Sequence, residues 1–255
     1  MQRSINYDDL AEVYDRRYEQ SDYSPVLQLL LDFTRGGERL LEIGCGTGQW
    51  LSELARAGHD IVGLDPSRNM LRIAMEKSRQ PMLIQGCAES IPFRTGTIDR
   101  FFCVNAFHHF RRKERSMVEA RRVLRDRGGI LIIGLDPHTG LDHWWIYDYF
   151  PQVIDVDKQR YPSAVSLRRS LQETGFINCG TIEALHMPIK LSARSALQSR
   201  RLEKTTTSQL TVLTDEEYNA GLGRLMRDIE VNEAQHKELT IVADLRLYAT
   251  TGWLR

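Results

Sequence analysis

The chain has 255 residues, 42% of them hydrophobic and 27% charged, which is the composition of an ordinary globular protein with a substantial core and argues against long disordered segments. Its 34 basic residues balance its 34 acidic residues. No net field therefore exists to attract a polyanion such as RNA or an anionic membrane surface, and the charge balance favours a small-molecule partner over nucleic acid.

The first part of the chain has the pattern of an α/β protein. Residues 7–19 and 24–33 are helical in pattern, and a short apolar run that ends in glycines predicts a buried strand over 39–44. The alternation then continues along the chain, with helices predicted over 49–57, 67–78 and 113–125 and strands over 60–65, 82–87, 98–107 and 129–135. Alternation of this kind predicts βαβ units and a doubly wound, mostly parallel sheet.

The alternation stops after residue 136. An aromatic segment precedes a predicted helix over 163–175 and a strand over 177–189, and a polar helical stretch over 192–238 precedes the final strand. We interpret residues of about 137–165 and 190–238 as insertions that form a helical cap over the strand ends and contact the substrate. The chain, 1–255, is expected to be a single domain whose core, about 36–136, binds a cofactor.

The stretch LEIGCGTG turns from a predicted strand into a helix and carries three alternate glycines, Gly44, Gly46 and Gly48. Glycines allow a sharp bend and a close approach of the backbone to a ligand, and the start of the helix offers free N–H groups that suit a carboxylate. Glu42 is suited to accept a hydrogen bond from an ammonium group, directly or through water. This combination favours a zwitterionic amino acid over a pyrophosphate, and the alternative is a tight turn without a ligand.

Two later segments are suited to the rest of a nucleoside ligand. Asp65 closes the second strand, where doubly wound proteins place a carboxylate for ribose hydroxyls, although an acid at a helix start is the alternative. Met70 is placed to lay its thioether against an adenine, or else belongs to the core. The segment CAESIPF, residues 87–93, follows the third strand and would border the adenine amino group.

The four segments LLEIGCGTG, GLDPSRNM, CAESIPF and VNAFHHF resemble, in order and spacing, the motif series of class I S-adenosylmethionine-dependent methyltransferases. The resemblance covers roughly residues 38–136. It implies a Rossmann-like, seven-stranded sheet whose last strand is antiparallel, and DLRLYATTG looks like that strand. Within the superfamily, YDDLAEVYD and NAFHHF are similar to the small-molecule branch that includes quinone-biosynthesis and cis-aconitate-type methyltransferases.

The resemblance implies S-adenosylmethionine as the cofactor. It assigns Glu42 and residues 44–48 to the methionine portion and Asp65 to the ribose. Many relatives carry an aspartate where this chain has Cys87, so Glu89 or a backbone carbonyl would accept from the adenine amino group here. The expected cofactor-binding residues are Glu42, Gly44, Cys45, Gly46, Gly48, Asp65, Pro66, Met70, Cys87, Ala88, Glu89 and Asn105.

Methyl transfer from a sulfonium is an in-line displacement, so the protein mainly has to align the nucleophile and exclude water, and a general base helps only if the acceptor arrives protonated. His109 is the candidate base or substrate contact, with a structural histidine as the alternative. Tyr14 is a candidate lid over the cofactor, with packing as the alternative. The candidate acceptor contacts are His108, His143, Trp144, Trp145, Tyr147 and Arg168. For the aromatic residues, packing of the cap onto the core is the alternative.

The four cysteines have no C-x-x-C pair and no zinc-like spacing with histidine, and no apolar run approaches the ~18 residues of a membrane span. We therefore expect no metal, no membrane span, a cytoplasmic location, and a monomer or homodimer acting on a small-molecule methyl acceptor. Two alternatives remain. A nicotinamide-dependent oxidoreductase usually spaces its glycines as G-x-G-x-x-G, whereas this chain has G-x-G-x-G, and a non-catalytic S-adenosylmethionine-binding module would retain the cofactor site without turnover.

Overall fold

The structure is a computed structural model. The residues that it describes are 11, 14, 15, 18, 21–34, 38–77, 81–199 and 202–255. The helix expected over residues 7–19 therefore lies largely outside the described part of the chain.

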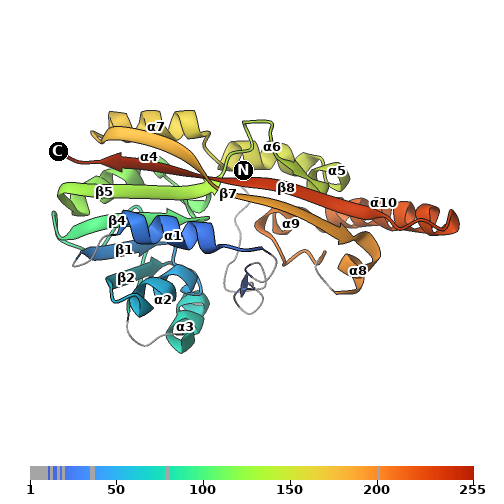
Figure 1. Ribbon diagram of the computed structural model, residues 1–255, viewed down its shortest axis with the longest axis horizontal. Helices are drawn as coiled ribbons and strands as arrows, with labels where there is room; N and C mark the ends of the chain where they lie inside the picture. Colours follow the sequence, from blue (N-terminus) through green and yellow to red (C-terminus); the bar gives the residue numbers. More distant parts are fainter. Residues whose placement is uncertain are drawn as a thin grey trace.

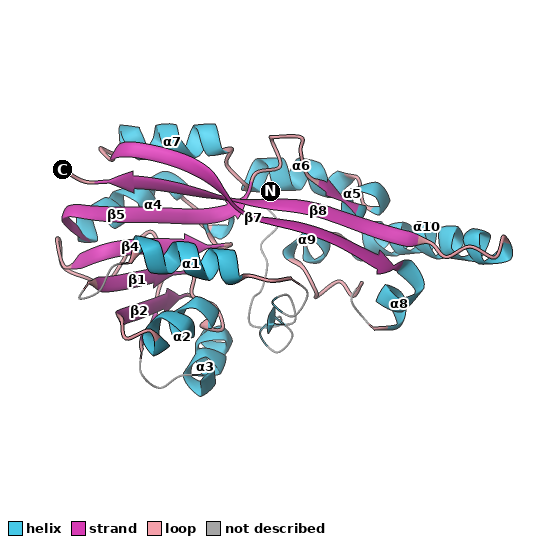
Figure 2. Cartoon of the chain, in the orientation of Figure 1, coloured by secondary structure: helices cyan, strands magenta, loops and turns pink. Residues whose placement is uncertain are grey.

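A single eight-stranded sheet runs through the described molecule in the order β3-β2-β1-β4-β5-β8-β6, with β7 paired to β8 (Figures 1 and 2). The strands from β1 to β5 pair in parallel, and β8 pairs antiparallel with β5, β6 and β7. The expected α/β class with a mostly parallel sheet and an antiparallel last strand is confirmed, and the two-residue β6 is additional to the seven longer strands. The strands are β1 Arg39–Ile43, β2 Asp60–Asp65, β3 Met82–Gln85, β4 Ile98–Val104, β5 Leu124–Leu135, β6 His143–Trp144, β7 Ile177–Ser192 and β8 Thr240–Trp253.

Helices cover both faces of this sheet and its extension. Outside the two insertions the helices are α1 Ser24–Phe33, α2 Gln49–Arg56, α3 Arg68–Lys77, η2 Phe107–His109, α4 Lys113–Val123 and α7 Ala164–Glu173. Those of the two insertions are α5 Trp145–Tyr149, α6 Gln152–Arg160, α8 Ala193–Gln198, α9 Ser208–Thr211 and α10 Asp215–Ala234.

The two sheet faces form two buried clusters, because neighbouring residues of a strand point to opposite faces. Leu40 and Phe102 belong to the cluster that contains residues of α1 and α2, whereas Leu41 and Phe101 belong to the cluster that contains residues of α4 and α7. All four side chains are at most 2% exposed. Burial on both faces explains why these strands read as continuous apolar runs in the sequence.

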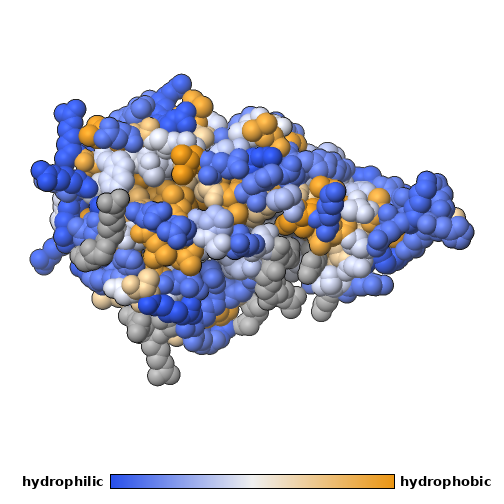
Figure 3. Space-filling view, in the orientation of Figure 1, coloured by the Kyte–Doolittle hydropathy of each residue, from blue (hydrophilic) through white to orange (hydrophobic). Residues whose placement is uncertain are grey.

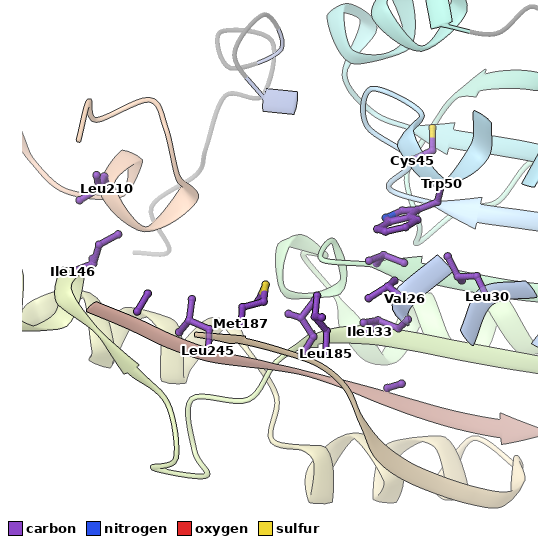
Figure 4. Packing of buried hydrophobic residues seen from close by; sticks show 14 of the residues in the cluster. Val26, Leu30, Cys45, Trp50, Ile133, Ile146, Leu185, Met187, Leu210 and Leu245 are labelled. Atoms are coloured by element: carbon purple, nitrogen blue, oxygen red, sulfur yellow. The ribbon is translucent and has the colours of Figure 1, made fainter. Parts of the chain in front are cut away.

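The strands β7 and β8 are longer than their neighbours and carry the insertions. They pair from Ile177 opposite Trp253 to Ser192 opposite Thr240, whereas β5 pairs only with residues 247–253 of β8. Beyond β5, Met187 and Leu245 pack in one continuous cluster with Ile146 of α5 and Leu210 of α9 (Figure 4). The insertions thus rest on an extension of the sheet, and hydrophilic side chains cover the outer end of α10 on the face drawn in Figure 3.

Candidate active site

The carboxyl ends of β1, β2, β3 and β4 border one cavity of about 540 Å³. In a parallel sheet these ends lie along one edge, which is where doubly wound proteins bind ligands. The cavity wall contains most of the residues singled out from the sequence, namely Tyr14, Gly44, Gly46, Asp65, Pro66, Met70, Cys87, Ala88, Glu89, Asn105, His108 and His109.

The glycine turn after β1 adopts a backbone that other residues rarely take. Gly44 and Gly46 have φ of +71° and +51°. A Cβ on Gly44 would lie 2.4 Å from Cβ of Ala106, so packing alone requires this glycine. A Cβ on Gly46 would meet only Cε1 of Tyr14 at 3.7 Å and Sδ of Met70 at 4.0 Å, both cavity residues. Gly46 therefore keeps the cavity side of the turn open, while Gly44 lets it approach the neighbouring strand end.

Asp65 connects the glycine turn to the end of β2. Its Oδ2 accepts a hydrogen bond from the Gly46 N–H at 2.9 Å and its Oδ1 accepts one from the Ser67 N–H at 2.8 Å. The side chain is 7% exposed and forms part of the cavity wall. Because each carboxylate oxygen can accept more than one hydrogen bond, Asp65 keeps acceptor capacity for a polar ligand in the cavity.

Glu42 and Cys45 lie behind the turn rather than on the cavity wall, and Gly48 is likewise absent from the wall. Burial raises the pKa of Glu42 well above its usual range, the nearby charge of Asp65 raises it further, and a hydrogen bond with the Leu51 backbone opposes both. Among the residues that the structure describes, Oε2 of Glu42 has no hydrogen-bond partner. Burial likewise raises the pKa of the Cys45 thiol, which makes it a core group rather than a nucleophile.

The side of the cavity near β2 and β3 is partly apolar. Met70 is 1% exposed and Ala88 is 5% exposed, so both are core residues as well as wall residues. Cys87 is exposed. Oε1 of Glu89 accepts a hydrogen bond from the Arg112 N–H at 3.0 Å, so one oxygen of the carboxylate proposed for the adenine amino group is already engaged within the protein.

The opposite side, beyond β4, carries the histidines. His108 and His109 belong to η2, and their ring centroids are 3.7 Å apart. His108 is buried and stacks on Tyr161, with centroids 3.9 Å apart and an angle of 19° between the rings. His109 is half-buried, so of the two imidazoles it is the one more open to a ligand.

The aromatic residues of the first insertion are not on this wall. Trp145 is buried against Phe150, and the hydroxyl of Tyr147 donates to Oδ2 of Asp157 at 3.0 Å. Trp144 packs edge to face on Tyr147. The exposed His143 lies 3.5 Å from the carboxylate of Asp148 and, like Arg168, is away from the cavity. The aromatic side chains of Trp144, Trp145 and Tyr147 therefore make packing contacts within the first insertion.

Arg160, at the end of α6, is a wall residue that the sequence analysis missed. Its side chain is 4% exposed overall, and Asp157, one helical turn earlier, is fully buried. The only signal in the sequence was the pair of opposite charges three residues apart in DVDKQR, a spacing that most exposed helices also contain. Arg111 and Phe110 complete this side of the wall.

The described residues lack two features. No three His, Cys, Asp or Glu side chains gather where they could hold a metal ion. No helix in the described part of the chain has the length and apolar character needed to cross a membrane.

The sequence is similar to that of known proteins, several of which are methyltransferases. A family model described as a methyltransferase domain matches residues 41–133. An uncharacterized protein of Methanocaldococcus jannaschii is 33% identical over 72% of this chain and 86% of its own length. Demethylmenaquinone methyltransferase of Thermotoga maritima is 31% identical over 56% of this chain and 66% of its own length. Two other relatives are matched over 47% and 60% of their length, so the chain spans about half of those proteins.

Solved structures share the fold. Phosphoethanolamine N-methyltransferase 2 of Haemonchus contortus, in complex with S-adenosyl-L-methionine, superposes with a TM-score of 0.62 at 17% identity. The alignment covers 98% of this chain and 60% of the Haemonchus chain. At this identity the likeness concerns the arrangement of strands and helices.

Proposed function

Because the chain belongs to the class I S-adenosylmethionine-dependent methyltransferase superfamily, we propose that it binds S-adenosylmethionine in the cavity at the ends of β1 to β4 and methylates a small-molecule acceptor. The observation that carries the proposal is the pairing of Gly46 with Asp65. An open glycine turn and a buried carboxylate are joined by one hydrogen bond on the wall of a single cavity.

The wall residues fit the three parts of this cofactor. The turn at Gly46 leaves room for an amino-acid moiety that a side chain would fill. Asp65 is a charged acceptor for ribose hydroxyls, and Met70 and Ala88 offer apolar surface to a purine. When bound, the cofactor supplies an electrophilic methyl group on a positively charged sulfur.

The protein's own part in the reaction is to orient the acceptor and to exclude water. Gly46 and Asp65 would hold the cofactor, which would supply the methyl group for an in-line displacement by the acceptor. A hydroxyl or amine acceptor also releases a proton, and we propose a ring nitrogen of His109 as the base that takes it. Tyr14, whose ring lies beside Gly46 on the wall, is proposed to cover the cofactor.

The choice of a small acceptor is supported by charge and by the relatives. The chain has no net charge to attract a nucleic acid. The matched Thermotoga relative and the Haemonchus structure are named as methyltransferases of demethylmenaquinone and phosphoethanolamine. We propose that the whole chain forms one domain, in which core residues of about 36–136 bind the cofactor. The two insertions, of about 137–165 and 190–238, form the acceptor side.

Calorimetric titrations with S-adenosylhomocysteine and with NAD test the cofactor. We expect binding of S-adenosylhomocysteine in preference to NAD, whereas preferential NAD binding would favour the nicotinamide-dependent class. A screen of small acceptors, read by release of S-adenosylhomocysteine, tests turnover. Tight cofactor binding without methylation of any acceptor would favour the non-catalytic binding module.

A further inference from the structure

Arg160 is a buried cation on the wall of the cavity. Two of its five N–H donors are engaged by Ser208 of α9, with Nη1 3.3 Å from the carbonyl oxygen and Nη2 3.0 Å from Oγ. A guanidinium retains its charge at every physiological pH, and burying a charge is costly unless it is paired. The wall position of Arg160 therefore calls for an explanation beyond packing.

Asp157 compensates this charge only in part. Its Oδ1 lies 3.8 Å from Nη1 of Arg160, which is too far for a hydrogen bond. Its two oxygens instead accept from the Tyr147 hydroxyl at 3.0 Å and from Nε2 of Gln209 at 3.5 Å. Asp157 thus stabilises the guanidinium by charge without using its hydrogen-bond donors.

Arg160 enters the cavity from the side opposite the proposed nucleoside pocket. The next residue, Tyr161, stacks on His108 at the end of β4, whereas Asp65 lies at the end of β2, and β1 separates β4 from β2 in the sheet. Arg160 is therefore a neighbour of the histidines at the acceptor end of the cavity.

The buried charges on the wall lie at different strand ends. The carboxylate of Asp65 is at the end of β2, whereas the basic wall residues, Arg111 and Arg160, lie beyond β4, where Glu89 accepts from the Arg112 N–H. Lys113 is close by, and its Nζ donates to the carbonyl oxygen of Phe110 at 3.4 Å. An acceptor with a negative group complements the basic side of this cavity.

Building on the proposed function, we infer that the methyl acceptor carries a carboxylate, which Arg160 binds at the acceptor end of the cavity. A guanidinium is a planar fork that matches a carboxylate with two parallel hydrogen bonds. A single buried guanidinium balances the one charge of a carboxylate, whereas a phosphate dianion would need a second buried cation on the wall. Arg111 is exposed, and Lys113 is not a wall residue. Ser208 holds the fork in place from the second insertion, so both insertions contribute to acceptor recognition.

The test compares acceptors on the unmodified protein. A panel of small hydroxy and amino carboxylic acids is assayed beside their carboxamides and the corresponding phosphate esters, with release of S-adenosylhomocysteine as the readout. We expect kcat/KM for the best carboxylate to exceed that of its carboxamide by on the order of 100-fold. Thermal shifts of the S-adenosylhomocysteine-saturated protein with the same compounds give the comparison without turnover. Equal responses to acids and carboxamides, or a preference for phosphate esters, would overturn the inference.

Variants assign the effect to Arg160. Arg160→Met is expected to raise KM for the best carboxylate on the order of 100-fold while leaving the Kd of S-adenosylhomocysteine within about 2-fold, and Arg160→Lys is expected to recover part of the loss. Arg169→Met, which removes an exposed charge from α7, is the control. An unchanged KM in folded Arg160→Met contradicts the inference. If that variant does not fold, the acid and carboxamide comparison decides.

The two proposals fail in different ways. Binding of S-adenosylhomocysteine with methylation of neutral acceptors contradicts only the carboxylate inference. Absence of S-adenosylhomocysteine binding contradicts the proposed function itself.

Discussion

At the scale of single residues, the space beside Gly46 is the feature most specific to a ligand. Its missing side chain would project among Tyr14 and Met70, with no contact shorter than 3.7 Å. The glycine is therefore not required by packing, in contrast to Gly44, whose Cβ would clash with Ala106.

Gly46→Ala is accordingly expected to weaken S-adenosylhomocysteine binding by about 10-fold or more, because the new methyl group occupies the space that the ligand would fill. The positive φ of +51° adds a loss of roughly 1 to 2 kcal/mol in the free energy of unfolding. Gly58→Ala is the matched control, since Gly58 has φ of +89° and no atom within 4 Å of its added Cβ. Calorimetry and urea unfolding should give a similar stability loss in both variants and a loss of affinity only in Gly46→Ala. Equal affinity losses in the two variants would contradict the proposal that the space beside Gly46 holds the cofactor.

The sequence predicted a shared position for residues that belong to local motifs. Gly46 and Asp65 each sit where a strand turns into a helix, so their place on one sheet edge follows from chain order. Arg160 was missed because its place on the wall depends on how an insertion folds back, and no local spacing encodes that. Trp145 was likewise not placed by its local sequence. Its aromatic side chain is buried, but it does not lie on the cavity wall.

At the scale of elements, α10 approaches the first insertion most closely at Gly221. A Cβ on Gly221 would lie 2.2 Å from Cδ1 and Cε1 of Phe150 and 2.8 Å from the carbonyl oxygen of Tyr149. On the same helix, a Cβ on Gly223 would meet only Nη1 of Arg227, at 3.6 Å. The close approach of α10 to α5 therefore depends on the first glycine and not on the second.

The same substitution in one helix should then have opposite effects. Gly221→Ala is expected to lower the free energy of unfolding by about 1 to 3 kcal/mol through overpacking. Gly223→Ala is expected to raise it by up to about 1 kcal/mol, because alanine favours a helix over glycine. Urea unfolding of the two variants measures this, and a shift of the same sign in both would argue against the packing of α10 on Phe150.

The core elements were predictable because burial on both sheet faces leaves continuous apolar runs, and β2 occupies the predicted residues 60–65. The remaining differences have physical causes. The fifth strand was expected from residue 129 because of two glycines, yet β5 begins at Leu124, which pairs with Ile98 across an irregular register. The two-residue β6 has too few residues to show any periodicity, and the extended pairing of β7 with β8 is a long-range contact that no local pattern indicates.

At the scale of the whole molecule, the buried polar group around Asp157 joins α5, α6 and α9. Burial raises the pKa of Asp157 from 3.8 to about 6. The folded protein therefore binds more protons than the unfolded chain between these values. Protonation of Asp157 thus stabilises the folded protein. The stabilisation is fully present below pH 3.8 and is lost as the pH rises through about 6.

Asp157→Asn removes that dependence. We compare the free energy of unfolding of the variant with that of the unmodified protein at each pH. The difference, variant minus unmodified, should become more positive by on the order of 2 to 3 kcal/mol between pH 4 and pH 7. Urea unfolding across this range measures the difference, with Asp155→Asn, an exposed acid of the same helix, as the control. A difference that does not change with pH would show that burial of Asp157 does not govern its protonation.

The glycine turn and the insertions share one continuous core, and Arg160 of the first insertion lies on the cavity wall. Residues of the glycine turn and of α9 belong to the same buried cluster, which includes Cys45 and Leu210 (Figure 4). The cofactor half could be predicted from the order of its motifs. The side of the cavity wall that carries Arg160 required the structure, because its residues converge only after the insertions fold onto β7 and β8.

The central claim, that Asp65 holds the ribose of S-adenosylmethionine in this cavity, is tested most directly by calorimetric titration of Asp65→Ala with S-adenosylhomocysteine. The loss of a charged acceptor for the ribose hydroxyls is expected to cost about 1.5 to 3 kcal/mol of binding free energy, whereas Asp60→Ala, at the exposed start of the same strand, should bind as the unmodified protein does. Unchanged affinity in a folded Asp65→Ala variant would contradict the account.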